Sequence, residues 1–230
     1  DFDMLHLPQD APERKAIKIL NPISEDLSVM RTMLTPSMLH AVVRNLRRGN
    51  TEGRFFELGR TFLADTLPPV EYPKENSVLC IGAFGEKENF FTAKGAVEAI
   101  AENFGLTFEY KKAARPYLHP GMTAEIYAGE RCVGVIGALA HDVAAELAIE
   151  KPVFLTEIDM DSLLPKLSER IVYRPLPRFA AESRDLALVM DEAVCCGEVQ
   201  KAIASCCKYI KSVTLFDVYR DALRIGTGKK

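Results

Sequence analysis

The stretch Ser28–Phe62 decides the fold of this chain and reads SVMRTMLTPSMLHAVVRNLRRGNTEGRFFELGRTF. Thr35 is typical of a helix N-cap and Pro36 of a first helical residue, because the first turn does not use the N–H that proline lacks. Apolar side chains then recur at helical spacing and predict one buried stripe, at Met38, Leu39, Val42, Val43 and Leu46. Gly49 and Asn50 are predicted to end the helix.

Three arginines lie on or beside the other face of this helix, near its C-terminus, where positive charge suits the helix dipole: Arg44, Arg47 and Arg48. After the helix, Arg54–Leu58 is predicted to be extended. Gly59-Arg60 is predicted to form a turn or bulge, and Thr61–Leu63 to continue the strand. A helix followed so closely by a strand indicates a layered sheet-and-helix domain and not a helix bundle.

The composition is that of an ordinary folded protein. The 230 residues are 48% hydrophobic and 27% charged, with a formal net charge of −3, which is unlike a disordered chain. No apolar run approaches the ~18 residues that a membrane-spanning helix needs, so we expect a cytoplasmic protein without membrane contact. The six cysteines include two adjacent pairs and no C-x-x-C spacing, so we expect free thiols and no metal site.

The charge is distributed unevenly along the chain. Residues 1–169 carry 18 Lys and Arg against 25 Asp and Glu, a net charge of −7, whereas residues 170–230 carry 11 against 7, a net charge of +4. A basic C-terminal part on an acidic body favours a polyanionic partner. The alternative interpretation is an ordinary solvated surface.

Downstream of the opening stretch, strands alternate with helices. A proline-rich loop is predicted at 67–76 and a hairpin tip at Gly129-Glu130, with a turn at Tyr117–Gly121. Helices are predicted at Phe91–Phe104 and His141–Leu147, and strands at Ser77–Phe84, Leu106–Lys111, Thr123–Ala128, Cys132–Leu139 and Val153–Asp159. Strands joined by tight turns, with helices between others, indicate an α+β fold with a mostly antiparallel sheet.

A domain boundary is expected within 161–177, with a helix ending near Ser168 and a stiff proline-rich linker at 174–177. This divides the chain into domains 1–169 and 170–230. In the second domain we predict a strand at Arg184–Met190, a helix at Gly197–Tyr209 and a strand at Val213–Tyr219. That β-α-β order is the first half of a ferredoxin-like fold, which we expect to be incomplete here.

Several blocks of the sequence together resemble one family. They are N-P-I-S-E-D at 21–26, M-R-T-x-L-x-P-x-x-L at 30–39, R-N-L-x-R-G-N at 44–50, F-E-L-G-R-T-F at 56–62, H-P-G-M-T-A-E-I at 119–126, P-R-F at 177–179, R-D-L-A-L-V at 184–189 and L-F-D-V-Y-R at 215–220. In this order they are similar to the C-terminal half of bacterial phenylalanyl-tRNA synthetase beta subunits, over nearly the whole chain. The resemblance implies a class II synthetase-like sheet in 1–169 and the start of an anticodon-binding domain in 170–230.

The resemblance also implies where catalysis would occur. Catalytic class II synthetases hold ATP with one arginine on a central strand and another at a helix start, because both contact the triphosphate as cations. This chain has Leu63 at the first position and Asp142 at the second. We therefore expect no catalytic residue and no cofactor here, with ATP and Mg²⁺ used by the holoenzyme through its alpha subunit.

Weaker candidates for chemistry remain. His119 and His141 could form an acid–base pair, although a histidine before Pro120 is more often structural. Glu157, Asp159 and Asp161 could bind a cation, although acids at a strand end are usually solvated.

The partners implied are a phenylalanyl-tRNA synthetase alpha subunit, in an (αβ)₂ enzyme, and tRNA, with no DNA. The apolar face near the opening helix exceeds what a thin layer can bury, which predicts a subunit interface at Arg31, Met33, Leu34, Met38, Leu39 and Val42. Basic residues of the second domain are the predicted RNA contacts: Arg178, Arg184, Lys201, Lys208, Lys211 and Arg220. The alternative function is a stand-alone enzyme that binds an adenylate or an amino acid on the same sheet.

Overall fold

The computed structural model of the chain describes residues 1–163, 173, 175–176 and 178–230. The chain divides into two units, Asp1–Glu169 and Arg170–Lys230, here named unit 1 and unit 2. The helix expected to end near Ser168 and two residues of the expected linker, Arg174 and Pro177, lie outside the described residues.

Unit 1 is built on a six-stranded sheet with the strand order β1-β2-β6-β5-β4-β3. Every neighbouring pair is antiparallel. The strands are β1 (Gly53–Leu63), β2 (Lys74–Phe84), β3 (Phe108–Lys112), β4 (Leu118–Ala128), β5 (Arg131–Leu139) and β6 (Val153–Asp159). The prediction of an α+β fold with a mostly antiparallel sheet is confirmed.

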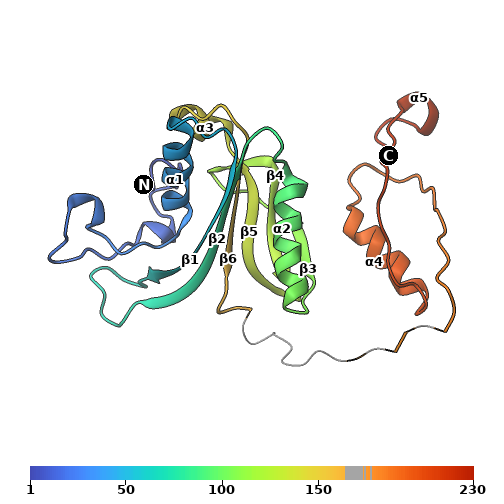
Figure 1. Ribbon diagram of the computed structural model, residues 1–230, viewed down its shortest axis with the longest axis horizontal. Coiled ribbons are helices and arrows are strands. Elements are labelled where there is room, and N and C mark those ends of the chain that lie inside the picture. Colours follow the sequence, from blue (N-terminus) through green and yellow to red (C-terminus); the bar gives the residue numbers. More distant parts are fainter. Residues whose placement is uncertain (164–172, 174, 177) are drawn as a thin grey trace. The chain divides into compact units, whose positions relative to one another are not determined.

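Helices cover both faces of this sheet. Helix α1 (Thr35–Arg47) lies on one face and α2 (Phe90–Asn103) on the other, while the short α3 (His141–Glu146) lies at one end of the sheet (Figure 1). Two 3₁₀ turns, η1 (Pro12–Arg14) and η2 (Glu25–Leu27), lie in the segment before α1. The predicted positions of all three α-helices are confirmed to within a residue or two.

The core on the α1 face forms because α1 buries its predicted stripe against the sheet. Met38 packs on Gly82 of β2, where a Cβ would come within 2.7 Å of the methionine side chain, so the absence of a side chain at Gly82 allows this approach. The N-terminal segment adds Leu5 and Leu7 to the same cluster, and α3 adds Val143. The segment that precedes α1 is therefore part of this core.

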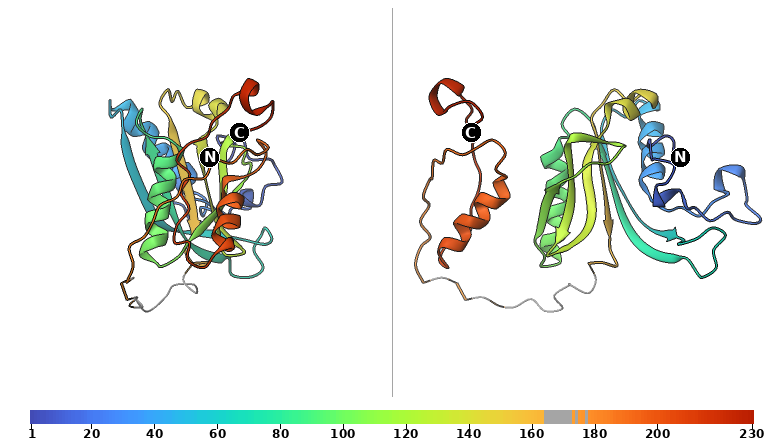
Figure 2. Two further views of the ribbon diagram at one scale, coloured as in Figure 1. Left: turned by 90° about the vertical axis from the view of Figure 1, so that its right-hand side faces the viewer. Right: turned by 180° about the vertical axis from the view of Figure 1, so that it is seen from behind.

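The core on the α2 face lies over the other half of the sheet. Asn89 and Thr92 form a capping box that starts α2, and Val97 is fully buried among residues of β4, β5 and β6. No residue of β1 belongs to this cluster. Among the described residues of unit 1, no helix therefore lies over the α2 face of β1 (Figure 2).

Two turns predicted in unit 1 differ from the structure. Strand β1 runs without a break from Gly53 to Leu63, because Gly59 forms no turn and instead makes room for the side chain of Arg31, whose guanidinium occupies the place where a Cβ would be. Of the turn predicted at Tyr117–Gly121, only Tyr117 lies in a turn, just before β4. Leu118–Gly121 form the irregular start of β4, with a register shift between Leu118 and Thr123.

Unit 2 differs more from its prediction. Helix α4 (Cys196–Cys206) is present, and α5 (Ala222–Ile225) follows, but Arg184–Met190 and Val213–Tyr219 form no strands. A strand exists only when a neighbour accepts and donates its hydrogen bonds. The one β-bridge in the described part of unit 2 joins Asp191 to Lys229, so the predicted β-α-β unit is corrected to a helix between irregular segments.

Candidate functional site

The two positions expected to correspond to catalytic arginines do not meet. Leu63 is the last residue of β1, whose 11 residues span roughly 33 Å. Asp142 lies in α3, just past the end of β5, at the end of the sheet where β1 begins (Figure 1). A single triphosphate cannot contact both positions, so the prediction that they mark one former nucleotide site is wrong.

Asp142 has a structural role in unit 1. Its carboxylate accepts a hydrogen bond from the backbone N–H of Val143 and lies 3.2 Å from His6. The backbone hydrogen bond from Val143, helped by His6, lowers the pKa of Asp142. This residue is a fixed negative charge that anchors the N-terminal segment to α3, and neither it nor Leu63 fits the phosphates of ATP.

The start of α1 is held by a carboxylate from the sheet. Glu157 of β6 accepts hydrogen bonds through Oε1 from the backbone N–H of Leu34 (2.7 Å), the backbone N–H of Thr35 (2.5 Å) and the hydroxyl of Thr35 (2.9 Å). Thr35 is thus not the N-cap: Leu34 occupies that position, and no side chain of the helix itself caps it. Burial raises the pKa of Glu157, against the opposing effect of these hydrogen bonds.

The apolar residues predicted to form a subunit interface lie inside unit 1. Five are buried in the core on the α1 face: Met33, Leu34, Met38, Leu39 and Val42. The premise that this layer cannot bury them is therefore wrong, because the N-terminal segment and the sheet cover them. Arg31 is the sixth residue; its side chain is 40% exposed and donates to Glu57 at 2.6 Å.

The uncovered apolar surface lies instead on the α2 face of β1 and β2. Phe56 and Leu58 of β1 are 78% and 64% exposed, and they pair in register with Ile81 and Leu79 of β2, which are partly buried. These four side chains are here named the β1–β2 strip. Exposed residues alternate with partly buried ones along β1. From the sequence, the signal is that Phe56 and Leu58 are two apolar residues at a spacing of two, which in a strand places them on one face.

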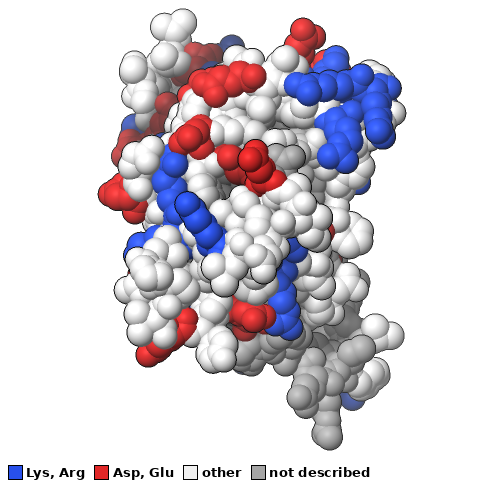
Figure 3. Space-filling model, turned by 90° about the vertical axis from the view of Figure 1, so that its left-hand side faces the viewer, with Lys and Arg blue, Asp and Glu red and all other residues white. Residues whose placement is uncertain are grey.

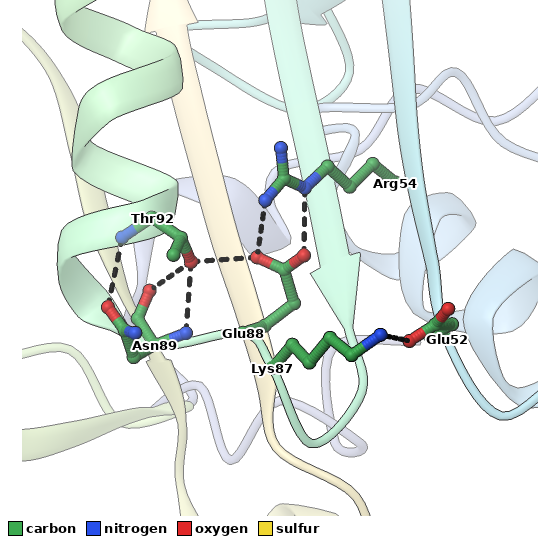
Figure 4. Close-up of polar contacts among 6 residues, drawn as sticks. All are labelled: Glu52, Arg54, Lys87, Glu88, Asn89 and Thr92. Atoms are coloured by element: carbon green, nitrogen blue, oxygen red, sulfur yellow. Dashed lines mark hydrogen bonds and ion pairs between the residues drawn. The ribbon is translucent and has the colours of Figure 1, made fainter.

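Charged pairs border the strip at both ends. At one end Arg60 pairs with Glu75 at 2.7 Å. At the other, Glu88 accepts two hydrogen bonds from Arg54 and one from Thr92, which joins β1 to the start of α2 (Figure 4). Burial alone would raise the pKa of Glu88, but the bonds from Arg54 and Thr92 outweigh it and hold the pKa below its usual range. An apolar centre with a charged rim is typical of a protein interface.

All six residues predicted to contact RNA are exposed in unit 2. Arg184 pairs with Glu182 at 2.5 Å and Arg220 with Glu192 at 2.9 Å, and the ammonium of Lys208 lies 5.2 Å from the ring of Tyr209. Arg178, Lys201 and Lys211 complete the set. The structure leaves them accessible and does not select among them.

The weaker candidates for chemistry have local structural roles. The Nδ1 atom of His119 accepts the N–H of Gly121 at 3.0 Å, and its ring packs edge-on against that of His141, 5.2 Å away. Asp159 and Asp161 accept hydrogen bonds from Ser162 and from the N–H of Ser77. Within the described residues, no three His, Cys, Asp or Glu side chains come together as a metal site, and no helix is both long and apolar enough to cross a bilayer.

Comparison with known proteins identifies the family. The family model of the phenylalanyl-tRNA synthetase beta chain CLM domain matches residues 1–160. The phenylalanine–tRNA ligase beta subunit of Clostridium tetani is 34% identical over all of this chain. Those of Halalkalibacterium halodurans and Geobacillus kaustophilus are 35% and 37% identical over 93% of it.

The chain spans 28–29% of the length of these relatives. The match runs through the sheet, both of its covering helices and, in the Clostridium relative, all of unit 2. The chain therefore belongs to the phenylalanyl-tRNA synthetase beta chain family.

Proposed function

We propose that this chain is a non-catalytic part of the beta subunit of phenylalanine–tRNA ligase, and that unit 1 supports the catalytic alpha subunit of an (αβ)₂ enzyme. The observation that carries the proposal is the match of the whole chain to beta subunits of that name. In this proposal the alpha subunit uses ATP and Mg²⁺ to attach phenylalanine to tRNA, and unit 1 is a class II-like sheet without the catalytic arginines. The assembly acts in the cytoplasm, where the six free cysteines would stay reduced.

The surface offered to the alpha subunit is the β1–β2 strip. Phe56 and Leu58 are large, exposed and adjacent on an edge strand, and burying such side chains stabilises a complex by removing apolar area from water. The bordering ion pairs Arg54–Glu88 and Arg60–Glu75 would lie at the polar edge of the interface. Such a strip on an otherwise well-buried sheet supports a docking role.

The test is assembly with a cognate alpha subunit, measured by analytical ultracentrifugation. The variant Phe56→Thr/Leu58→Thr removes the apolar surface and keeps good strand formers, and we expect it to weaken assembly about tenfold or more. The matched control is Leu20→Thr/Val70→Thr, which removes two apolar side chains that are exposed elsewhere on unit 1. Equal weakening by both variants would contradict the assignment of the strip.

The proposal also predicts that the chain alone does not activate phenylalanine. ATP–pyrophosphate exchange with phenylalanine and Mg²⁺ is expected at background, because in this proposal the arginines that hold ATP belong to the alpha subunit. Exchange above background would support the alternative, a stand-alone enzyme on the same sheet. The role proposed for the basic residues of unit 2 is contact with tRNA phosphates, which is salt-dependent.

A further inference from the structure

The C-terminal half of α1 carries a group of cations that unit 1 does not use. Arg44, Arg47 and Arg48 are exposed and, with His40 and Val43, line a surface hollow of about 320 Å³. Their spacing of three and four residues places them on one side of the helix, with Cβ atoms about 5–6 Å apart. Figure 3 shows Lys and Arg side chains gathered at the upper right of this face of the molecule.

These three guanidinium groups differ from most other arginines of unit 1. Five arginines elsewhere are each paired with a carboxylate: Arg14, Arg31, Arg54, Arg60 and Arg115. Within the described residues, no ion pair or hydrogen bond is made by the side chains of the α1 group. The nearby His40 already has a partner, because its Nε2 atom lies 3.1 Å from the carboxylate oxygen Oδ1 of Asp1. Three uncompensated positive charges thus lie together on a unit whose net charge is −7.

Helix stability is only part of the reason for three arginines at this place. Positive charge near a helix C-terminus is stabilising, but like charges three and four residues apart repel each other and offset part of that gain. The last turn of α1 also has its own backbone hydrogen bonds: the N–H of Arg48 donates to the carbonyl oxygen of Asn45, and the N–H of Gly49 donates to that of Leu46. An anion bound between the three guanidinium groups would relieve their mutual repulsion, so the cluster suits an external anion.

The arrangement of the group suits a polyanion such as a nucleic acid. A guanidinium binds either a phosphate or a carboxylate through two parallel hydrogen bonds, but several adjacent guanidinium groups match a polymer that carries a phosphate on every nucleotide. The hollow is lined by Val43 alone among apolar residues, so it offers little to a folded protein surface.

We propose that Arg44, Arg47 and Arg48 form a phosphate-binding surface for tRNA on unit 1, separate from the basic residues of unit 2. This rests on the proposed function in that tRNA is taken as the polyanion. The contact is to the sugar–phosphate backbone, which positions an RNA but carries no sequence information directly. Its contribution is therefore electrostatic and sensitive to salt.

The experiment measures binding of the full 230-residue chain to fluorescein-labelled tRNA by anisotropy, over a series of salt concentrations. In the variant Arg44→Gln/Arg47→Gln/Arg48→Gln, glutamine keeps helix propensity close to that of arginine. We expect its affinity at low salt to fall at least tenfold. The slope of log affinity against log salt is expected to become shallower by about two to three, one unit for each phosphate that the variant no longer neutralises.

The matched control is Lys18→Gln/Lys74→Gln/Lys112→Gln, which removes the same charge from exposed positions elsewhere on unit 1. It should change the affinity less than twofold. Equal losses in the two variants would mean that only net charge matters, and would overturn the proposal. The variant Arg44→Lys/Arg47→Lys/Arg48→Lys should recover the salt slope, which a purely structural role of the arginines would not predict.

The outcomes separate this proposal from the proposed function. If the glutamine variant binds tRNA like the unchanged chain while Lys208→Gln/Lys211→Gln weakens binding, the α1 surface is wrong and the RNA role belongs to unit 2. If the unchanged chain does not bind tRNA even at low salt, the α1 surface is again wrong. Assembly with the alpha subunit tests the supporting role independently.

Discussion

A single carboxylate, that of Glu157, ties the start of α1 to the middle of the sheet. It accepts the two backbone N–H groups and the hydroxyl that the helix start presents. The sequence shows Glu157 only as one acid in an apolar strand, and a nearby Thr-Pro pair favoured Thr35 as the cap. Which group caps α1 depends on β6 lying beneath it, 122 residues away in the chain.

Replacing Glu157 by glutamine should change the pH dependence of stability. Burial raises the pKa of Glu157 above its ordinary value of 4.5, so between those two pKa values the folded chain holds a proton that the unfolded chain has released. The free energy of unfolding contributed by Glu157 is then full below pH 4.5 and is lost as pH rises through the folded pKa. Glu157→Gln keeps an acceptor oxygen and removes this loss.

The measurement is the melting temperature of the unchanged chain and of Glu157→Gln from about pH 4 to pH 8. Carboxyls with lowered pKa, such as Glu88 and Glu125, produce the opposite slope, but they are shared by the two proteins and cancel in the difference. We expect the unchanged chain to lose stability relative to Glu157→Gln as pH rises. Parallel curves would show that Glu157 titrates normally.

Gly134 lies where the neighbouring strand leaves no room for a side chain. A Cβ there would overlap the carbonyl oxygen of Glu157 and lie 3.0 Å from the Cα of Ile158, and both are backbone atoms that cannot move alone. Gly134→Ala should therefore destabilise the chain by about 1–3 kcal/mol through forced separation of β5 and β6. Urea unfolding monitored by circular dichroism measures this, and an unchanged midpoint would contradict it.

At the scale of the element, β1 differs from its predicted form because its place in the sheet matters more than its local sequence. Its alternation of exposed and partly buried residues is that of a half-covered strand. Gly59 interrupted the pattern and favoured a turn, yet its small size serves the side chain of Arg31. Phe56 and Leu58 stay exposed because β1 is an edge strand that α2 does not cover.

Gly95 of α2, unlike Gly134, lies where a side chain would have room. Gly95 lies in its interior, is exposed, and has no atom within 4 Å of the place where a Cβ would lie. Gly95→Ala should stabilise the chain by about 0.5–1 kcal/mol, because alanine restricts the unfolded chain and favours the helix. The same urea titration tests it, and destabilisation would show that Gly95 serves a contact made outside this chain.

At the scale of the whole molecule, the two units differ in how much of the chain they bury. Both cores belong to unit 1, whereas α4 has no buried residue. Backbone hydrogen bonds that are shielded by packing open rarely, and exposed ones open often. The units should therefore differ in local stability.

Hydrogen exchange followed by mass spectrometry should make this difference visible. We expect slow exchange in α1, β5 and β6, and exchange close to that of an unfolded chain in Arg184–Met190 and Val213–Tyr219. Because both classes of peptide come from one sample, each is the control for the other. Protection of the two unit 2 segments would indicate that they form strands in solution.

Most elements of unit 1, the antiparallel α+β class and the family were predictable from the sequence alone, because these depend on local periodicity, turn residues and a series of motifs in order. Only the tertiary structure decided which apolar residues stay exposed, that Leu63 and Asp142 lie at opposite ends of the sheet, and that Glu157 caps α1. Each of these depends on which segments distant in sequence lie beside one another. The same reason explains unit 2: a strand needs a partner, and apolar alternation in one segment cannot supply it.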